Sequence, residues 1–235
     1  MKKYLLWVCG YFLVLTITVG SAAGISSLIT VFSEQRPVSN RKTVVIDAGH
    51  GGIDGGATSC SGICESQINL QIALRLNDLM HLLGIHTVMI RTDDVSIHTS
   101  GTTIAQKKIS DLKERVRIAN ECTNSFLISI HQNYFSDSRY RGAQVFYSST
   151  ENSQGLAKSL QTALVGTINK GSIRQIKRGE GIYLLQHITC PGVLIECGFL
   201  SNPDEDKLLQ TTLYQQKLCC VIASTCSVFL FNRST

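Results

Sequence analysis

The sequence has little proline and few aromatic residues. Its 235 residues include 3 Pro and 1 Trp, and aromatic side chains make up 7%. With so little proline and no low-complexity tract, the chain lacks the composition of a long linker, a collagen-like segment or a repeat array. Because 43% of the residues are apolar and only 17% are charged, the chain can bury a core, which excludes intrinsic disorder.

An excess of one charge sign is also nearly absent. The chain has 22 Lys and Arg against 17 Asp and Glu, a formal net charge of +5. Its basic residues do not gather with aromatic residues in a stripe, which is the usual pattern of a nucleic-acid interface. We therefore expect no nucleic-acid partner.

The longest run without charge lies at the N-terminus. Lys2 and Lys3 precede an uncharged stretch at residues 4–32, and about 20 residues suffice to cross a bilayer. Small residues at 21–23 are of the kind that a signal peptidase accepts. Residues 1–32 therefore predict either a signal peptide or a signal anchor, and both would export the rest of the chain. Residues 33–42 would then form a short tether, and residues 43–235 one domain.

Cysteine usage does not indicate a disulfide scaffold. Of nine cysteines, Cys9 lies in the apolar N-terminal segment, and the spacing of the other eight matches no compact disulfide framework. We therefore expect mostly buried thiols. Cys60 and Cys64 are close together in a loop rich in glycine and serine, and a local disulfide between them is a hypothesis.

Short apolar runs alternate with helical patterns from residue 43 onward. Strands are predicted at 43–47, 86–90, 126–130, 143–147, 182–185 and 193–195. Helices are predicted at 65–83, around 112–119, at 152–168 and from 204 onward, and residues 92–107 as an irregular polar segment. This alternation predicts a single α/β domain with a central, mostly parallel or mixed β-sheet flanked by helices on both faces.

Three residues that can bind metal or transfer protons follow or end predicted strands: His50, His131 and Glu196. Because functional groups collect at the carboxyl ends of strands in open α/β sheets, we expect the three to converge. Glu65 opens the first long helix, where the helix dipole favours a carboxylate. Two imidazoles and a carboxylate form the ligand set of a catalytic zinc site, although each residue alone also fits a purely structural role. Glu196 follows a buried apolar run, where a carboxylate is costly unless paired, metal-bound or protonated.

Several motifs occur in the order of a known family. They are VIDAGHGG at 45–52, Glu65 with Asn69 and Leu70, RTD at 91–93, Arg115 with Ala119 and Asn120, SIHQN at 129–133, and PGVLIECGFLSNP at 191–203. In these motifs the chain resembles zinc-dependent N-acetylmuramoyl-L-alanine amidases of the amidase type 3 family, from residue 43 to the C-terminus. Within that family it is most similar to the small germination-specific subgroup.

The resemblance implies a role for each matching residue. His50, Glu65 and His131 would bind one Zn²⁺ per chain, and Glu196 would be the catalytic carboxylate. The substrate would be peptidoglycan, and the cleaved bond the amide between the lactyl group of N-acetylmuramic acid and L-alanine of the stem peptide. The subgroup implies action on spore cortex, for muramic-δ-lactam formation and germination. Some family members also need an activating protein partner.

Two other functions fit the same residues. A zinc peptidase that cuts within wall peptides would use the same ligand set, and a non-catalytic exported wall-binding protein would keep the fold. For Arg91 and Arg115 we expect structural roles, whereas Asp47 would either orient a metal ligand or cap a turn. The segment between Tyr147 and Ile182 is too short for the inserted helix that covers the zinc of some larger relatives, so we expect an open groove.

Overall fold

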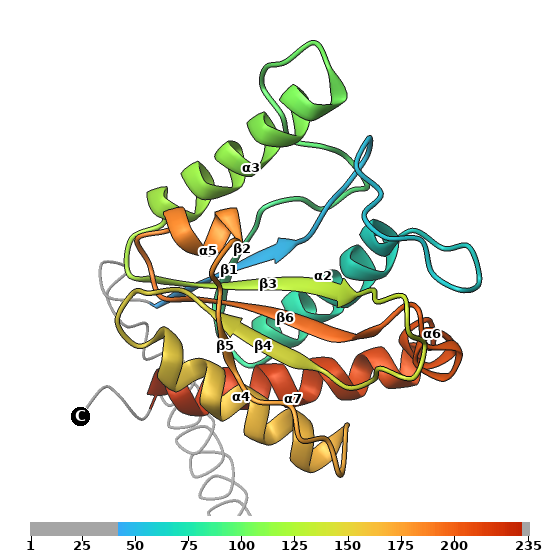
Figure 1. Ribbon diagram of the computed structural model, residues 1–235. Coiled ribbons are helices and arrows are strands. Elements are labelled where there is room, and N and C mark those ends of the chain that lie inside the picture. The colour runs from blue at the N-terminus through green and yellow to red at the C-terminus, as the bar shows by residue number, and fades with distance from the viewer. Residues whose placement is uncertain (1–41, 232–235) are drawn as a thin grey trace, which may run out of the picture. The chain divides into compact units, whose positions relative to one another are not determined.

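The computed structural model describes residues 42–231, which form one α/β domain around a six-stranded sheet (Figure 1). The predicted signal peptide or anchor at 1–32 lies outside the described residues, as does nearly all of the tether. The strands are β1 (Thr43–Ala48), β2 (His86–Met89), β3 (Ser125–Asn133), β4 (Gln144–Tyr147), β5 (Lys177–Arg178) and β6 (Gly192–Phe199). The helices are α2 (Glu65–Leu82), α3 (Ile104–Glu121), α4 (Ser153–Thr167), α5 (Tyr183–His187), α6 (Pro203–Leu209) and α7 (Thr212–Phe231).

The strands are ordered β2-β1-β3-β6-β4-β5. Strands β2, β1, β3 and β6 are parallel, whereas β4 runs antiparallel to β6 and β5 runs parallel to β4. The sheet is therefore mixed and mostly parallel, which confirms the predicted fold class. The parallel strands point their carboxyl ends at one edge of the domain, where the candidate residues lie.

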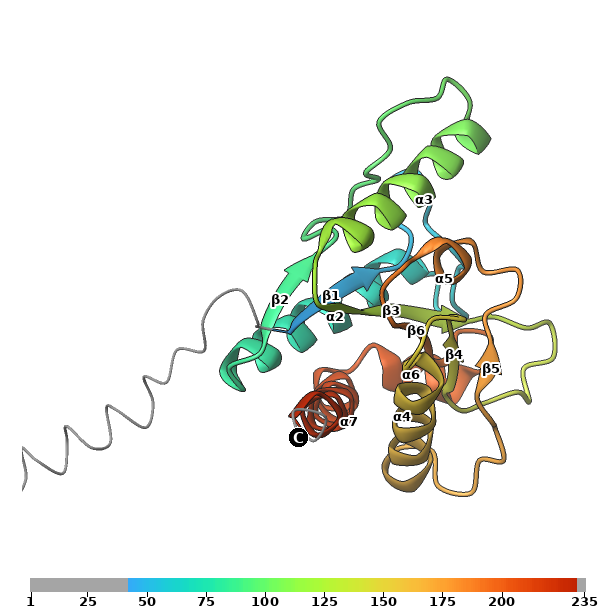
Figure 2. The same ribbon diagram turned by 90° about the vertical axis from the view of Figure 1, so that its left-hand side faces the viewer.

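Helices cover both faces of the sheet, as Figure 2 shows. Val44 and Ile46 of β1 belong to a large core that also contains residues of α2, α4 and α7. Val45, which points the other way, belongs to a smaller core with residues of α3 and α5. This alternation follows from the two-residue period of a strand, and burial on both faces explains why the β1 sequence is continuously apolar before Asp47.

The helices on the larger core follow the predicted patterns. In α2, Ile68, Ile72, Leu76 and Met80 recur every fourth residue and are fully or almost fully buried. Helix α7 packs against α2 and α4. Within the described part of the chain, α7 alone is long and apolar enough to cross a membrane by length and composition. Its buried residues belong to the core of this domain, so its length and composition do not indicate a membrane span.

Three local predictions were wrong. Helix α3 begins at Ile104, inside the segment predicted to be irregular, and Thr103 and Gln106 form a reciprocal capping box at its start. The run predicted as a strand at 182–185 contains the start of α5 instead, because a short apolar run fits a strand and a helix equally well. Strand β5 was missed because it has only two residues, both exposed.

Strand β6 contains an irregularity where it passes the candidate site. His131 of β3 pairs with Glu196 of β6, but two residues further along β3, Asn133 pairs with Phe199. Strand β6 thus has one extra residue, a β-bulge, over this interval. Because of the bulge, Phe199 lies on the same face of the sheet as Glu196, although regular alternation over three positions would place it on the opposite face.

Candidate metal centre and active site

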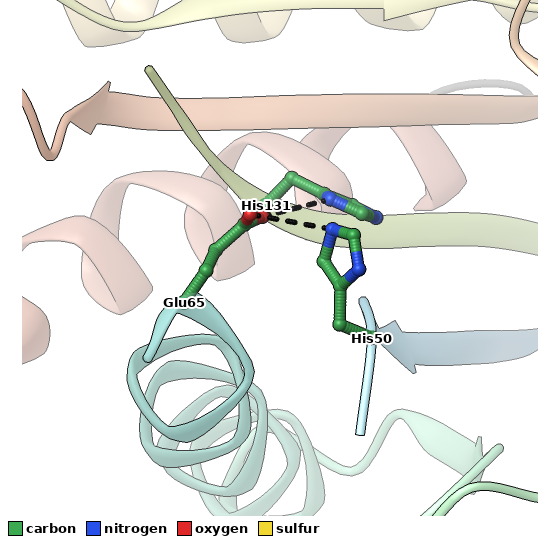
Figure 3. Close-up of side chains that lie close together, drawn as sticks. All are labelled: His50, Glu65 and His131. Atoms are coloured by element: carbon green, nitrogen blue, oxygen red, sulfur yellow. Dashed lines mark hydrogen bonds and ion pairs between the residues drawn. The ribbon is translucent and has the colours of Figure 1, made fainter. Parts of the chain in front are cut away.

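Three side chains from separate elements converge at the carboxyl end of the sheet, as Figure 3 shows. His50 follows β1, His131 lies near the end of β3, and Glu65 is the first residue of α2. One ligand atom from each residue lies within 4.8 Å of the other two. The Glu65 carboxylate is central, with Oε2 3.3 Å from His50 Nε2 and Oε1 3.0 Å from His131 Nδ1. The three side chains are therefore close enough together to bind one metal ion.

The Glu65 carboxylate is also held by donors from the protein. Oε2 accepts a hydrogen bond from the backbone N–H of Ala57, and Oε1 accepts from the backbone N–H of Gln132 and the side-chain amide of Asn69. Burial raises the pKa of Glu65, but the hydrogen bonds and charges of His131 and His50 outweigh it and hold the pKa well below its usual range. Glu65 is therefore ionised at any physiological pH.

The loop that carries His50 has an unusual backbone conformation. His50 has a φ of 61°, in the left-handed region that residues other than glycine rarely adopt. Two buried arginines hold this segment through its carbonyl groups. Arg115 donates to the carbonyls of Ala48 and His50, and Arg91 donates to those of Ala48 and Gly49. Strained backbone at a site persists where the surroundings over-determine it, and here the two guanidinium groups do so.

Two glycines make room for the converging side chains. A Cβ atom on Gly49 would lie 2.1 Å from His131 Nε2, and a Cβ atom on Gly56 would lie 2.6 Å from Glu65 Oε2. Both distances are far below contact distance, so only glycine fits at either position. The packing of backbone against the imidazole and carboxylate fixes their orientation before any ligand binds.

The carboxylates around His50 make the cluster favourable for a positive charge. Burial lowers the pKa of His50, but hydrogen bonds and charges from Glu65 and Asp54 outweigh this effect and raise the pKa to about 9. The same anionic surroundings that favour a protonated imidazole favour a metal ion in place of the proton. The donor set of two imidazoles and one carboxylate matches that of catalytic zinc sites, so the residues present could hold such an ion.

Glu196 lies beside the cluster but is held differently. It is the register partner of His131 on the neighbouring strand, so both side chains lie on the same face of the sheet. Its Oε2 atom is buried and has no hydrogen-bond partner among the described residues. Burial raises the pKa of Glu196 to about 7, and the opposing charge effects of the nearby His131 and Glu65 do not prevent this. A carboxyl group with this pKa can accept and return a proton near neutral pH.

The remaining family-pattern residues have mainly supporting contacts. Asp47 is buried, pairs with Arg115 and accepts a hydrogen bond from the Ser129 hydroxyl. Its carboxylate therefore anchors the arginine that holds the His50 backbone, rather than either imidazole. The contacts of Arg91 and Arg115 agree with the structural roles expected for them.

Sequence reasoning missed the residue that orients His50. Asp54 Oδ2 lies 2.9 Å from His50 Nδ1, and Asp54 Oδ1 lies 2.7 Å from the ammonium group of Lys108 on α3. The available signal was the short spacing HGGID, which a tight turn between Gly51 and Asp54 closes through two backbone hydrogen bonds. Lys108 had no signal at all, because it lies between the segment predicted to be irregular at 92–107 and the helix predicted around 112–119.

Cys60 and Cys64 are both free thiols in the structure, so the hypothesised disulfide is not formed. The Cys60 thiol donates to the carbonyl of Leu200 instead. Of the eight described cysteines, four are buried: Cys190, Cys197, Cys219 and Cys226. The expectation of mostly buried thiols thus holds for only half of them.

A cavity of about 1140 Å³ lies next to the site. Its lining includes Gln144 of β4, which pairs in register with Glu196, but neither Glu196 itself nor any of the three converging donors. The imidazoles of His50 and His131 keep 26% and 19% of their side-chain surface exposed, so the cluster itself opens to solvent. As the sequence predicts, the residues between Tyr147 and Ile182 hold α4 and β5 and no second helix.

Comparison with known proteins identifies the family to which the chain belongs. The N-acetylmuramoyl-L-alanine amidase family model Amidase_3 matches residues 44–225. The chain belongs to this family. It is 37% identical over 183 residues to the germination-specific N-acetylmuramoyl-L-alanine amidase of Bacillus subtilis, covering 77% of this chain and 76% of that protein.

Solved structures of amidases agree with this assignment. The CwlD amidase from Clostridioides difficile, solved in complex with the GerS lipoprotein, has a TM-score of 0.77 and 39% identity. That match covers 81% of this chain and 98% of CwlD. An N-acetylmuramoyl-L-alanine amidase from Clostridium difficile 630 has a TM-score of 0.71 and 31% identity, over 81% of this chain and 97% of the other. This chain is therefore an enzyme of the N-acetylmuramoyl-L-alanine amidase family, with His50, Glu65 and His131 as its possible metal site.

Proposed function

We propose that this amidase is zinc-dependent and hydrolyses the amide between the lactyl group of N-acetylmuramic acid and L-alanine of the stem peptide. The observation that carries the proposal is the pairing of two kinds of group at one place. Three donors converge on a cation-sized position, and an unpartnered carboxyl group, Glu196, lies on the adjacent strand. Peptidoglycan is the substrate class of the family to which the chain belongs.

In this proposal His50, Glu65 and His131 hold the metal. The ligands are arranged by the protein before binding, because Glu65 is ionised and Asp54 orients the His50 ring. When bound there, zinc would lower the pKa of a water ligand to about 7 and would polarise the carbonyl of the scissile bond. The partly exposed imidazoles leave one side of the cluster open for water and substrate.

Glu196 acts as the general base and then as the general acid. The ionised carboxylate takes a proton from the attacking water, and the protonated carboxyl returns that proton to the leaving amine of L-alanine. In the metal-free protein, burial raises the pKa of this carboxyl group to about 7, so a proton is easily gained and lost there near neutral pH. Positioned acid–base catalysis of this kind contributes about 10²–10⁴-fold to the rate.

The relatives support a narrower biological role. One is named germination-specific, and another was solved with a lipoprotein partner. We propose that this chain acts outside the cytoplasmic membrane on spore cortex peptidoglycan, for muramic-δ-lactam formation and germination, and that a protein partner activates it. The N-terminal segment at residues 1–32 would direct export and, if uncleaved, would hold the enzyme at the membrane.

The direct test compares the full-length protein with Glu196→Gln on purified peptidoglycan. We expect the parent to release whole stem peptides with free L-alanine amino termini. The variant should keep one zinc per chain and lose at least about 100-fold in rate, because glutamine cannot accept the proton. Glu151→Gln, a change at an exposed carboxylate far along the chain, is the matched control and should behave as the parent.

Other outcomes would identify a different function. Cleavage inside the peptide, with L-alanine still attached to muramic acid, would mean a zinc peptidase. Zinc binding without cleavage by the parent, even with a partner protein added, would mean a non-catalytic wall-binding protein. A Glu196→Gln protein with undiminished hydrolysis would remove Glu196 from the mechanism.

A further inference from the structure

The cavity next to the site contains the guanidinium group of Arg174, which no described carboxylate pairs with at ion-pair distance. Arg174 Nε donates to the carbonyl of Arg141 at 2.8 Å, and Nη1 donates to the side-chain oxygen of Gln144 at 2.8 Å. The flat face of the group lies over the ring of Phe199, 4.5 Å from its centroid. The Glu205 carboxylate of the same cavity acts on this group electrostatically but is not bonded to it, and within the described residues Nη2 donates no hydrogen bond.

This arrangement is unlike that of an ordinary surface arginine. A long exposed side chain loses conformational entropy when it is fixed, and here two hydrogen bonds and a stacked ring fix it. The other described arginines near the site, Arg91 and Arg115, donate to backbone carbonyls of the His50 loop. These hydrogen bonds account for the burial of the two side chains. Arg174 is also fixed by hydrogen bonds, but these use only Nε and Nη1 of its guanidinium group.

Arg174 is held against a residue that pairs with Glu196 in the sheet. Gln144, which accepts from Arg174, is the register partner of Glu196, so the two strands β4 and β6 place them one inter-strand spacing of about 4.8 Å apart. The bulge in β6 places Phe199, the ring below the guanidinium, on the same face as Glu196. A substrate that reaches Glu196 would therefore pass close to the side of the sheet on which Arg174 is held.

The charge of the cavity favours an anionic occupant. Five basic and three acidic side chains line it. Asp137 pairs with Arg139, which leaves four basic and two acidic side chains. One of these acids, Glu205, accepts from the backbone N–H groups of Gly142 and Phe199 and keeps its charge. Free positive charge therefore exceeds free negative charge around Arg174.

We propose that Arg174, supported by Gln144 and Phe199, is a carboxylate-binding subsite for the stem peptide. The inference rests on the proposed function, because it takes the stem peptide as the substrate. A planar guanidinium binds a carboxylate through paired hydrogen bonds, and the stem peptide carries free carboxylates in the residues that follow L-alanine. Arg174 is a specificity-determining residue in this view, since it binds substrate away from the reacting atoms.

The test uses two soluble substrates, a muramoyl peptide with free carboxylates and the same compound with those carboxylates amidated. We expect the parent to have a KM for the acid form about 10- to 100-fold lower than for the amide form, the range for a hydrogen bond to a charged group. Arg174→Gln should raise the KM for the acid form by the same factor, leave kcat unchanged and leave the amide form unaffected. Arg174→Lys should restore part of the preference, because it keeps the charge without the planar fork.

Arg139→Gln is the matched control, because Arg139 lines the same cavity but is highly exposed and already paired with Asp137. It should leave both KM values within about twofold of the parent, since an exposed ion pair contributes little. Equal loss on both substrates in Arg174→Gln would mean that Arg174 only supports the fold, and would overturn the proposal. Unchanged kinetics in that variant would overturn it too.

A binding measurement separates this proposal from the proposed function. Titration calorimetry of the free stem peptide, in acid and amide forms, into the zinc-loaded full-length protein requires no turnover. Binding that favours the acid form and is lost in Arg174→Gln supports the subsite even if the protein hydrolyses neither substrate. Equal binding of the two forms overturns the subsite even if the amidase activity is confirmed.

Discussion

Glu65 and Glu196 lie in the same site, yet the protein surrounds these two carboxyl groups in opposite ways. Glu65 receives two backbone N–H groups, an amide side chain and two imidazoles, which hold its pKa well below the usual range. Glu196 has an oxygen with no partner among the described residues, and burial raises its pKa to about 7. One group is locked in its ionised form, and the other lies close to its titration midpoint at neutral pH.

The difference shows how a fold assigns two functions to one residue type. A metal ligand must stay deprotonated and fixed, and a dense set of donors ensures both. A group that transfers protons needs both protonation states within reach, and withholding hydrogen-bond partners from a buried carboxyl group provides them. The following predictions test each half of this contrast.

The largest effect should follow from Glu65→Gln, which removes the fixed charge and keeps the shape. Changes around a metal ligand lower affinity by about 10- to 100-fold, so loss of the ligand charge itself should lower zinc affinity by more than about 100-fold. Hydrolysis should fall with it. Zinc content after dialysis against a weak chelator measures the effect, and Glu151→Gln serves as the control. Full zinc occupancy in the variant would exclude Glu65 as a ligand.

A smaller loss should follow from Asp54→Asn, which leaves all three donors in place. Asp54 orients the His50 ring and balances its charge, and removing such a contact lowers metal affinity by about 10- to 100-fold. Competition with a fluorescent zinc chelator measures the change. Asp78→Asn on the exposed side of α2 should show none. Equal affinities for Asp54→Asn and the parent would mean that Glu65 and the backbone alone fix the imidazole.

In the metal-free protein, Glu196→Gln should change how stability depends on pH. The folded pKa of about 7 exceeds the ordinary value of 4.5, so the folded protein favours protonated Glu196, and this stabilisation is lost as pH rises from below 4.5 through 7. Glutamine mimics the protonated form at every pH. The variant should therefore be more stable than the parent by about 1–3 kcal/mol at pH 8, and close to it at pH 4.

Thermal unfolding with a chelator present, at both pH values, measures this difference. The expected shift at pH 8 is a few degrees for a domain of this size. A constant difference at the two pH values would mean that Glu196 titrates normally, and the contrast with Glu65 would then be lost.

The smallest effect should come from replacing both Cys60 and Cys64 by serine. The two thiols precede Glu65 but form no disulfide and contact none of the three donors through an observed hydrogen bond. We expect unchanged zinc content and a stability within about 0.5 kcal/mol of the parent, in oxidising and in reducing buffer alike. A loss of zinc only in oxidising buffer for the parent would show that the thiols do influence the metal ligands.

Much of the fold follows from patterns that the sequence displays directly. The four-residue spacing of Ile68, Ile72 and Leu76 predicts α2, and the apolar run before Asp47 predicts β1. Segments without a strong period were less predictable. The run at 182–185 is too short for its period to distinguish strand from helix, and β5 has only two exposed residues.

The candidate site was predictable to a similar extent. The positions of His50, His131 and Glu196 near strand ends, and of Glu65 at a helix start, indicate that they can meet. The residues around them could not be found in this way, since Lys108 reaches Asp54 from another helix and Arg174 reaches Gln144 from a loop. Such contacts depend on how elements pack, which residue spacing along the chain does not encode.

The bulge in β6 places Glu196 and Phe199 on the same face of the sheet, although they are three positions apart. A strand with regular alternation would present Glu196 and then Gly198 there, and Phe199 would point into the core with α6. Deleting a single residue between Glu196 and Phe199 would therefore do more than shorten the strand. It would turn the ring away from Arg174 while leaving Glu196 in place, so the proposed carboxylate subsite depends on a single position in the chain.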